Sequence, residues 1–145
     1  MIEVVYPELK PAVKVEDGKE QIFCIIRKRW LIITPEEWVR QNFLLFLTGT
    51  MGYPASLIAV EKQVSVTGMN RRFDIVVFNQ QAQPFMIVEC KEMNVKLTEE
   101  VLSQVLRYNT EVSAGYLVIT NGSYTRAFEN QPGNFKEIDQ LPTIR

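Results

Sequence analysis

The 145-residue sequence predicts a single α/β domain. An apolar fraction of 46% with 23% charged residues is ordinary for a globular chain that buries one core. Segments in which apolar residues recur at helical spacing alternate with short runs of β-prone residues. The predicted order is an N-terminal hairpin extension (1–33), a core of helix, three strands, helix and strand (34–122), and a C-terminal extension (123–145).

The N-terminal extension contains two apolar-rich arms on either side of Asp17-Gly18. This dipeptide between β-prone runs is typical of a hairpin turn, so we expect strands near residues 12–16 and 21–26. The sequence RWLII, at 29–33, is a candidate extension of the same unit. A homodimer formed through residues 11–26 is compatible with this pattern.

The first helix begins at Thr34, which can act as the N-cap, with Pro35 at the first helical position. Glu36 and Glu37 favour the positive end of the helix dipole, and Glu37 completes the spacing of a capping box. A core-facing stripe follows at helical spacing: Val39, Phe43, Phe46 and Leu47. On this spacing Glu36 falls on the inward face, which is unusual for a carboxylate.

Three strand candidates come next. Residues 56–68 alternate between polar and apolar, whereas 71–79 and 84–91 are denser in apolar residues, as strands covered on both faces would be. The polar segment NQQAQP, at 79–84, suits a turn between antiparallel neighbours.

The remaining core elements are a helix and a strand. Residues 97–113 are amphipathic, with Thr98 as a cap, and 114–122 are a short buried strand that ends in an Asn-Gly turn. For the C-terminal extension we expect one more short strand and an irregular tail.

The composition excludes several kinds of chemistry. The chain has no histidine, so a Ser-His-Asp triad, a Cys-His dyad and imidazole acid–base catalysis are excluded. Two cysteines without histidine make a poor zinc set, and Cys24 and Cys90 both lie in apolar runs. Catalysis would have to use carboxylates, lysine, tyrosine or a metal held by oxygen.

Location and partners are only weakly constrained. No apolar stretch approaches the roughly 18 residues of a spanning helix, and the acidic, proline-interrupted start is not a secretory signal. We therefore expect a cytoplasmic protein with no membrane partner. The net charge of −1 shows no global basic field for nucleic acid.

Three ionisable residues are expected to converge at one end of the sheet. Because side chains alternate along a strand, Glu89 and Lys91 project to the same side and Cys90 to the other. Asp74 lies within FDIVVF, where a charge is costly unless it is paired or metal-bound. If 72–79 and 84–90 pair as a hairpin, Asp74 comes level with Glu89–Lys91, with Glu36 as a candidate fourth member.

This cluster suits phosphodiester hydrolysis without histidine. Two carboxylates can hold Mg²⁺, which lowers the pKa of a bound water and polarises a phosphoryl oxygen. The lysine can orient the water or offset charge developing on the phosphate. A solvent-exposed Glu-Lys pair at a strand end, with Asp74 marking a strand start, explains the same residues about equally well.

Together, Asp74, Glu89-x-Lys91 and an upstream helix acid resemble the PD-(D/E)xK nuclease superfamily. More narrowly, residues 30–122 resemble the N-terminal nuclease domain of type I restriction enzyme R subunits, in segments that run from TPEEWVRQ and GTMGYPASLIAVEKQV through RRFDIVVF, VECKEMNVKL and QVLRYN to YLVITNG. The resemblance implies a restriction-endonuclease-like αβββαβ core, with a central mixed sheet flanked by helices. It also implies a Mg²⁺-dependent DNA endonuclease.

The resemblance also implies roles for individual residues. Asp74 and Glu89 would be metal ligands for Mg²⁺, for which Mn²⁺ can substitute, and Lys91 the catalytic lysine. The first-helix acid would be a further ligand or water contact, and the resemblance does not choose between Glu36 and Glu37.

Gln104 and Tyr108 match a QxxxY element found in a subset of these nucleases. Residues four apart on a helix share one face, from which both could contact the lysine or the DNA backbone. The alternative for Tyr108 is core packing with its hydroxyl at the rim.

Three arginines are candidates for DNA binding. Arg71 and Arg72 immediately precede Asp74, where they could meet phosphate, although short basic clusters are usually solvated surface. Arg40 lies four residues after Glu36, so a helical ion pair is the alternative for it.

The resemblance extends to only part of the R subunit, in which the nuclease is fused to an ATP-driven motor. This sequence contains no GxxxxGK[ST] loop, so we expect motor-coupled activity to need a motor or specificity subunit in trans. The alternative function is a non-catalytic nucleic-acid-binding or assembly module that keeps the nuclease fold.

Overall fold

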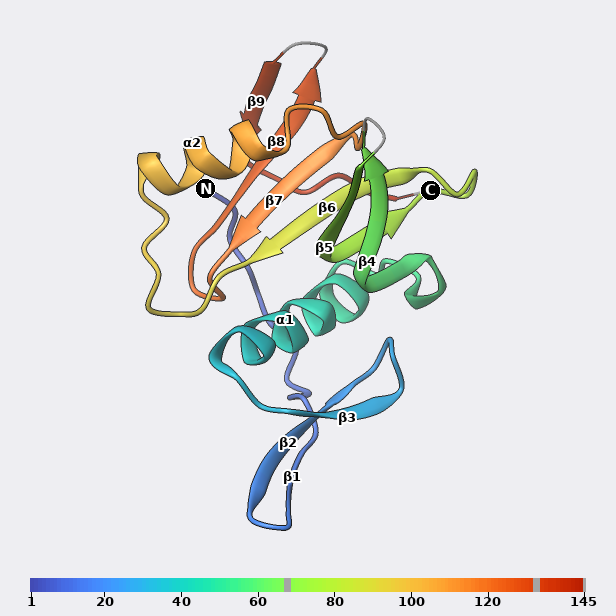
Figure 1. Ribbon diagram of the computed structural model, residues 1–145, viewed down its shortest axis with the longest axis vertical. Coiled ribbons are helices and arrows are strands. Elements are labelled where there is room, and N and C mark those ends of the chain that lie inside the picture. The colour runs from blue at the N-terminus through green and yellow to red at the C-terminus, as the bar shows by residue number, and fades with distance from the viewer. Residues whose placement is uncertain (67–68, 132–133, 145) are drawn as a thin grey trace.

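The computed structural model describes residues 1–66, 69–131 and 134–144. Two sheets lie on either side of helix α1, and a second helix, α2, packs on the larger sheet (Figure 1). The elements in chain order are β1 (Val13–Glu16), β2 (Lys19–Cys24), β3 (Arg29–Ile32), α1 (Pro35–Leu45), β4 (Ile58–Val66), β5 (Met69–Phe78), β6 (Pro84–Cys90), α2 (Glu99–Tyr108), β7 (Tyr116–Thr120), β8 (Thr125–Gln131) and β9 (Asn134–Ile138).

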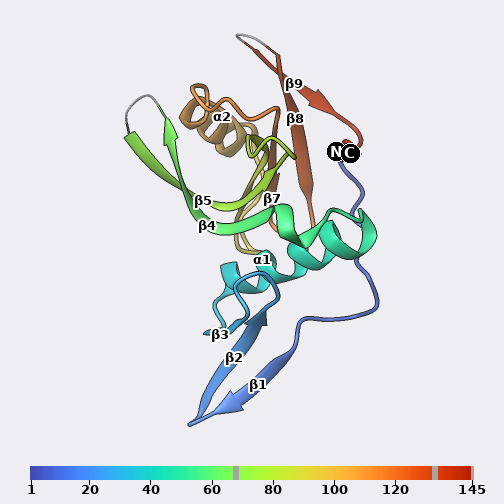
Figure 2. The same cartoon turned by 90° about the vertical axis from the view of Figure 1, so that its right-hand side faces the viewer.

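The N-terminal sheet contains three antiparallel strands in the order β1-β2-β3. Asp17 and Gly18 both have positive φ, 54° and 73°, as a two-residue type I′ hairpin turn requires. The predicted hairpin is confirmed, with β2 ending at Cys24 and residues 29–32 adding the third strand. The β1–β2 hairpin points away from the larger sheet on the far side of α1 (Figure 2).

Helix α1 begins as predicted. The side chain of Thr34 accepts a hydrogen bond from the backbone N–H of Glu37 at 3.0 Å. In a capping box the Glu37 carboxylate would accept a hydrogen bond from the Thr34 backbone N–H. The hydrogen bonds that it accepts here come from Arg27, Arg40 and Gln41. After Leu45 the helix continues as a wider π-helical turn over Phe46–Thr50.

The larger sheet has six strands in the order β4-β5-β6-β7-β8-β9. β6 and β7 are parallel and the other neighbouring strands run antiparallel, so the predicted mixed sheet and αβββαβ order are confirmed. Each face packs on one helix. The α1 cluster includes Phe43, Ile75 and Val88, and the α2 cluster includes Leu102 and Ile119.

The C-terminal extension differs from the prediction of a single strand, because β8 and β9 both extend the same sheet. β9 is an edge strand whose partly buried apolar residues, Phe135 and Ile138, are three apart and give no period-two signal. Thr67 and Gly68, at the end of one predicted strand, lie outside the described residues. Within the described part of the chain, no helix has the length and apolar character needed to cross a membrane.

The turn after β7 generates a stability prediction. Gly122 has φ +91°, and a Cβ there would meet Val39 Cγ2 at 3.4 Å, whereas a Cβ at Gly18, with φ +73°, would have no atom of the described residues within 4 Å. We expect Gly122→Ala to lower the free energy of unfolding by about 1–3 kcal/mol, and the matched Gly18→Ala by about 1 kcal/mol. Urea denaturation measures both, and a smaller loss at Gly122 than at Gly18 would contradict the proposed packing against Val39.

Candidate active site

Asp74 lies at an irregular point in β5. The last pair before it in the β5–β6 ladder is Ile75–Val88, and beyond that pair Asp74 Oδ2 accepts a hydrogen bond from the Cys90 backbone N–H at 2.8 Å. Phe73 belongs to the α2 cluster and Ile75 to the α1 cluster, so simple alternation fails at Asp74. Opposite this break, Glu61 on β4 has φ +52°. The break directs the carboxylate toward the end of β6.

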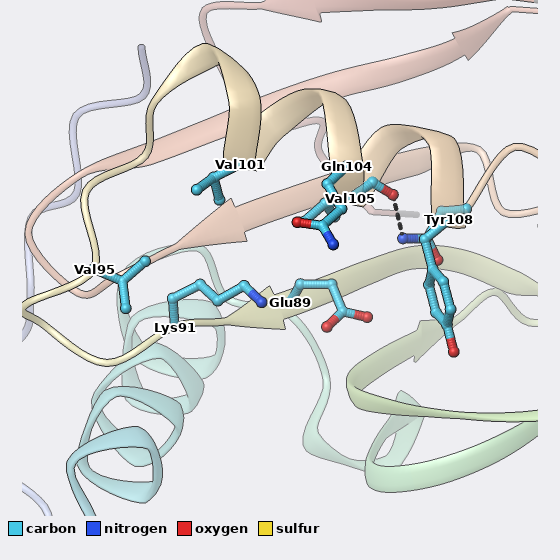
Figure 3. A pocket seen from close by; sticks show the side chains of 8 residues that line it. Glu89, Lys91, Val95, Val101, Gln104, Val105 and Tyr108 are labelled. Atoms are coloured by element: carbon cyan, nitrogen blue, oxygen red, sulfur yellow. Dashed lines mark hydrogen bonds between the residues drawn. The ribbon is translucent and has the colours of Figure 1, made fainter.

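Glu89 and Lys91 come from that end of β6. Both line one pocket beneath α2, whereas Cys90 belongs to the α1 cluster, so the predicted division between the two faces is confirmed (Figure 3). The backbone N–H of Lys91 donates to the Thr120 carbonyl at 2.8 Å, which continues the parallel pairing with β7 past the strand end. The structure therefore brings Asp74 next to Glu89–Lys91.

The acids at this strand end are crowded. Burial raises the pKa of Glu89 to about 8, and the Asp74 carboxyl, which lies close enough to share a hydrogen bond, adds to the rise while Lys91 opposes it. The pKa of Glu36 is also raised, first by burial and then by Asp74. The three carboxyl groups therefore share one electrostatic environment.

The two first-helix acids have different surroundings. The Glu36 side chain is 52% exposed and the Glu37 side chain is 11% exposed, so the prediction that Glu36 is the inward-facing acid is wrong. Glu36 stands in the first turn, at the end of the helix, and still lies close to Asp74 and Lys91. Of the two, Glu36 is the helix acid at the strand end, and Glu37 belongs to a buried polar network.

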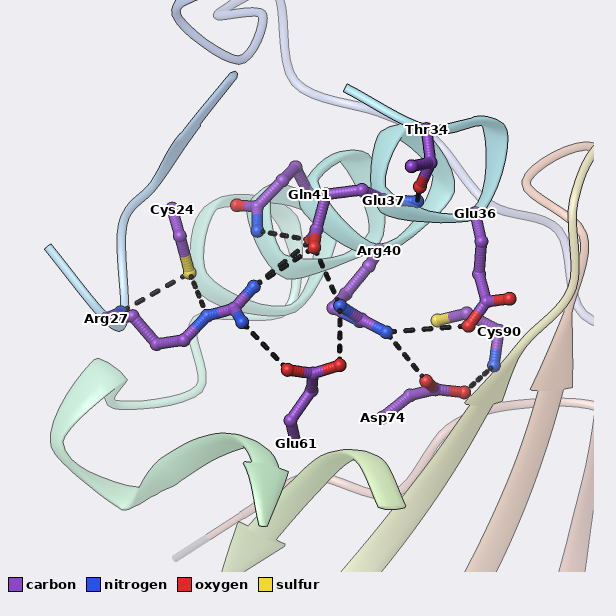
Figure 4. A network of polar contacts seen from close by, with 10 residues as sticks. All are labelled: Cys24, Arg27, Thr34, Glu36, Glu37, Arg40, Gln41, Glu61, Asp74 and Cys90. Atoms are coloured by element: carbon purple, nitrogen blue, oxygen red, sulfur yellow. Dashed lines mark hydrogen bonds and ion pairs between the residues drawn. The ribbon is translucent and has the colours of Figure 1, made fainter. Parts of the chain in front are cut away.

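Arg40 is at the centre of this network (Figure 4). Its guanidinium reaches Asp74 Oδ1 at 2.9 Å, Glu37 Oε1 at 2.8 Å and Glu36 Oε1 at 3.5 Å. A fourth acid, Glu61, lies at 3.7 Å. The side chain is only 6% exposed, so the expectation that Arg40 binds DNA is replaced by a structural role as a buried counter-ion.

A second arginine extends the network to the N-terminal sheet. Arg27, in the turn between β2 and β3, donates to both carboxylate oxygens of Glu37 at 3.2 Å and to Glu61 at 3.1 Å. Gln41 also donates to Glu37, at 3.0 Å. Sequence reasoning missed Arg27, Gln41 and Glu61, and the only signal for Arg27 is its place in the run of basic residues at 27–29.

Gln104 and Tyr108 line the same pocket as Glu89 and Lys91, so their predicted common face points at the strand end (Figure 3). Tyr108 is 56% exposed, and the alternative of core packing is therefore wrong for it. The Arg71 guanidinium lies 4.0 Å from the centre of the Tyr108 ring, and Arg71 also donates to the Tyr108 carbonyl. Arg72 is exposed next to it on β5.

Comparison with known proteins identifies the family. The family model that describes the type I restriction enzyme R protein N terminus matches residues 35–142 of this chain. The chain belongs to this family. The resemblance seen in the sequence is thus confirmed, whereas no curated protein matches the chain.

Two solved structures are similar to this member of the R protein N-terminal family. The cryoEM structure of a DrdV–DNA complex has a TM-score of 0.50 and 19% identity, covering 72% of this chain and 10% of that chain. The type IIG restriction endonuclease BpuSI has a TM-score of 0.44 and 23% identity, and the match covers 66% of this chain and 11% of that chain. The likeness to DrdV is one of fold, and this chain spans about a tenth of the length of either protein.

The donor set at the strand end fits a hard divalent cation. Asp74 and Glu89 are two neighbouring carboxyl groups on adjacent strands, and Mg²⁺ binds through one or two carboxylates while keeping several waters. Within residues 1–66, 69–131 and 134–144, no group of three or more His, Cys, Asp and Glu side chains is arranged to hold a metal. A cation here would therefore rest on the carboxylate pair and on water.

The buried network generates a stability prediction for this family member. Arg40→Met would leave several carboxylates without their counter-ion, so we expect a loss of about 3–5 kcal/mol in the free energy of unfolding. Arg126→Met is the matched control, because Arg126 pairs with Glu137 near the surface, with side chains 22% and 32% exposed, and should cost about 1 kcal/mol or less. Equal losses in urea denaturation would show that Arg40 is no more important than a surface arginine.

The crowded carboxyl pair generates a prediction of pH dependence. The pKa of Glu89 is higher in the folded state than its ordinary value of 4.5, so the folded protein binds this proton more tightly than the unfolded chain does. Stability should therefore fall as pH rises from about 4.5 to about 8, with the full penalty above that range.

Glu89→Gln removes the penalty. In EDTA it should raise the Tm by roughly 2 °C or more at pH 8.5, and much less at pH 4.5. Glu3→Gln, at an exposed glutamate, is the control and should change the Tm little at either pH. If Glu89→Gln lowers the Tm equally at both pH values, the crowding of the carboxyl pair is not destabilising.

Proposed function

We propose that this chain is a Mg²⁺-dependent DNA endonuclease domain that hydrolyses phosphodiester bonds. The observation that carries the proposal is the meeting of Asp74, Glu89 and Lys91 at one strand end, with Glu89 protonated more readily because it is buried beside Asp74. Membership of the R protein N-terminal family supports it. The DrdV neighbour was solved with DNA, which favours DNA as the substrate here.

Asp74 and Glu89 would hold the cation, with Glu36 as a water contact. Bound Mg²⁺ supplies a water of lowered pKa and polarises a phosphoryl oxygen. Lys91 would orient the attacking water or stabilise negative charge on the phosphate through its ammonium group. Arg40 would keep one Asp74 oxygen fixed while the Cys90 N–H fixes the other.

The surroundings of the site suggest how the domain would work. Arg71 and Arg72, next to Asp74 in β5, would meet the DNA backbone. A cytoplasmic location and a motor or specificity subunit in trans are parts of the same proposal, since the match to DrdV covers only 10% of that chain. Pairing of two copies through residues 11–26 is compatible with it.

One observation favours a second function, a nucleic-acid-binding or assembly module without catalysis. Arg40 pairs with Asp74 at 2.9 Å, which already neutralises a proposed metal ligand. Calorimetric titration with Mn²⁺ separates the two functions. A nuclease should bind the ion, and Asp74→Ala should abolish that binding, whereas a module of the second kind has no need of it.

The decisive test is nicking of supercoiled and branched DNA with Mg²⁺ or Mn²⁺. We expect Lys91→Ala and Asp74→Ala to lower the nicking rate by at least about 100-fold, because each removes a charge that acts at the reacting phosphate. Lys19→Ala, in the distant β1–β2 hairpin, should cut like the wild type. If all four proteins cleave at the same rate, the active-site assignment is wrong.

A further inference from the structure

A pocket of about 350 Å³ lies between the end of β6 and helix α2 (Figure 3). Its walls are of three chemical kinds. Val95, Val101 and Val105 provide apolar surface, Tyr108 an aromatic ring, and the polar groups are Glu89, Lys91, Gln104 and Asn109. A volume of this size is in the range of small-molecule sites and fits a group as large as one nucleoside.

Tyr108 is a large aromatic side chain kept at the surface in a defined position. The ring is 56% exposed, although the neighbouring α2 residues Leu102 and Val105 are buried. Arg71, on β5, places its guanidinium 4.0 Å from the ring centre and binds the Tyr108 carbonyl. Such cation–π pairs fix a ring in place, and exposed rings in basic surroundings are platforms on which bases stack.

The pocket shares Glu89 and Lys91 with the proposed hydrolytic site. A DNA strand with a phosphate at Lys91 would place an adjoining nucleoside within reach of the valines and Tyr108. In a duplex that base is already stacked between its neighbours and paired, and taking it out costs a few kcal/mol. Moving an unpaired base into the pocket costs much less free energy, because no base pair has to be broken.

We propose that this pocket binds one unpaired nucleotide of single-stranded DNA next to the phosphate at Lys91. The base stacks on Tyr108, the sugar packs on the valines, and the Gln104 amide hydrogen-bonds the base edge. This inference rests on the proposed function only in identifying that phosphate as the one cleaved. It makes single strands, flaps and mismatches the preferred substrates over fully paired duplex.

Binding without cleavage tests the proposal. In EDTA, fluorescence anisotropy compares a labelled 15-nucleotide single strand with the matched 15-base-pair duplex. We expect the wild type to bind the single strand at least about 10-fold more tightly. Tyr108→Ala should weaken that binding by about 10-fold, as the loss of one base–aromatic stack would, and change duplex binding less than about twofold.

Two variants control for effects other than stacking. Tyr108→Phe keeps the ring and should bind like the wild type. Tyr124→Ala removes a tyrosine that is also 56% exposed but lies outside this pocket, and it should leave binding unchanged. A 2-aminopurine in the single strand should be quenched on binding to the wild type and not on binding to Tyr108→Ala.

The proposal is overturned if Tyr108→Ala weakens single-strand and duplex binding equally, or if Tyr124→Ala has the same effect as Tyr108→Ala. These results are distinct from failure of the nuclease proposal. If nicking depends on Asp74 and Lys91 but Tyr108→Ala does not selectively weaken single-strand binding, the nuclease proposal stands and the nucleotide-site proposal fails. If Tyr108→Ala selectively weakens single-strand binding but the wild type does not nick DNA, the nucleotide-site proposal stands and the nuclease proposal fails.

Discussion

The buried guanidinium of Arg40 is the constraint on which the strand-end arrangement depends. Four carboxylates from α1, β4 and β5 lie around it, and without an internal cation they would repel one another in a site where Glu37 and Asp74 are largely shielded from water. Arginine suits this position better than lysine, because its planar fork can bind several acceptors in fixed directions at once. Arg40, together with Arg27, therefore offsets part of the negative charge of this dense group of acids without a metal ion.

The same network explains why the N-terminal sheet belongs to the site although it lies on the far side of α1. Arg27 leaves the turn after β2 and binds Glu37, Glu37 binds Arg40, and Arg40 binds Asp74. The β2–β3 turn and α1 thus help to determine where the carboxylate of Asp74 points, 34 residues beyond Arg40 in the chain. A change in the β2–β3 turn would alter the position of the Asp74 carboxylate through these charged hydrogen bonds, because they are stronger and more directional than apolar contacts.

Much of this arrangement could be predicted from local rules, and the exceptions have physical causes. Strand alternation placed Glu89 and Lys91 on one side, and Thr34 capped α1 as its spacing indicates. Alternation could not place Asp74, because the break opposite Glu61 depends on the pairing of two strands. Helical spacing misassigned Glu36, since a first-turn residue can lie beyond the edge of the core. The partners of Arg40 come from three elements, and no local pattern in the sequence encodes such a set.

The two faces of the sheet contribute different chemistry, and they meet at one strand end. The α1 face supplies charge balance, through Arg40 acting on Asp74. The α2 face supplies the pocket that holds Glu89 and Lys91. The carboxyl groups of Asp74 and Glu89 interact because the β5–β6 ladder stops at Ile75–Val88 and the Asp74 side chain takes the place of a backbone partner for Cys90. Arg40 neutralises Asp74 and is not bonded to Glu89 in the described structure, so Glu89 is the acid for which the proposed Mg²⁺ would supply the missing positive charge.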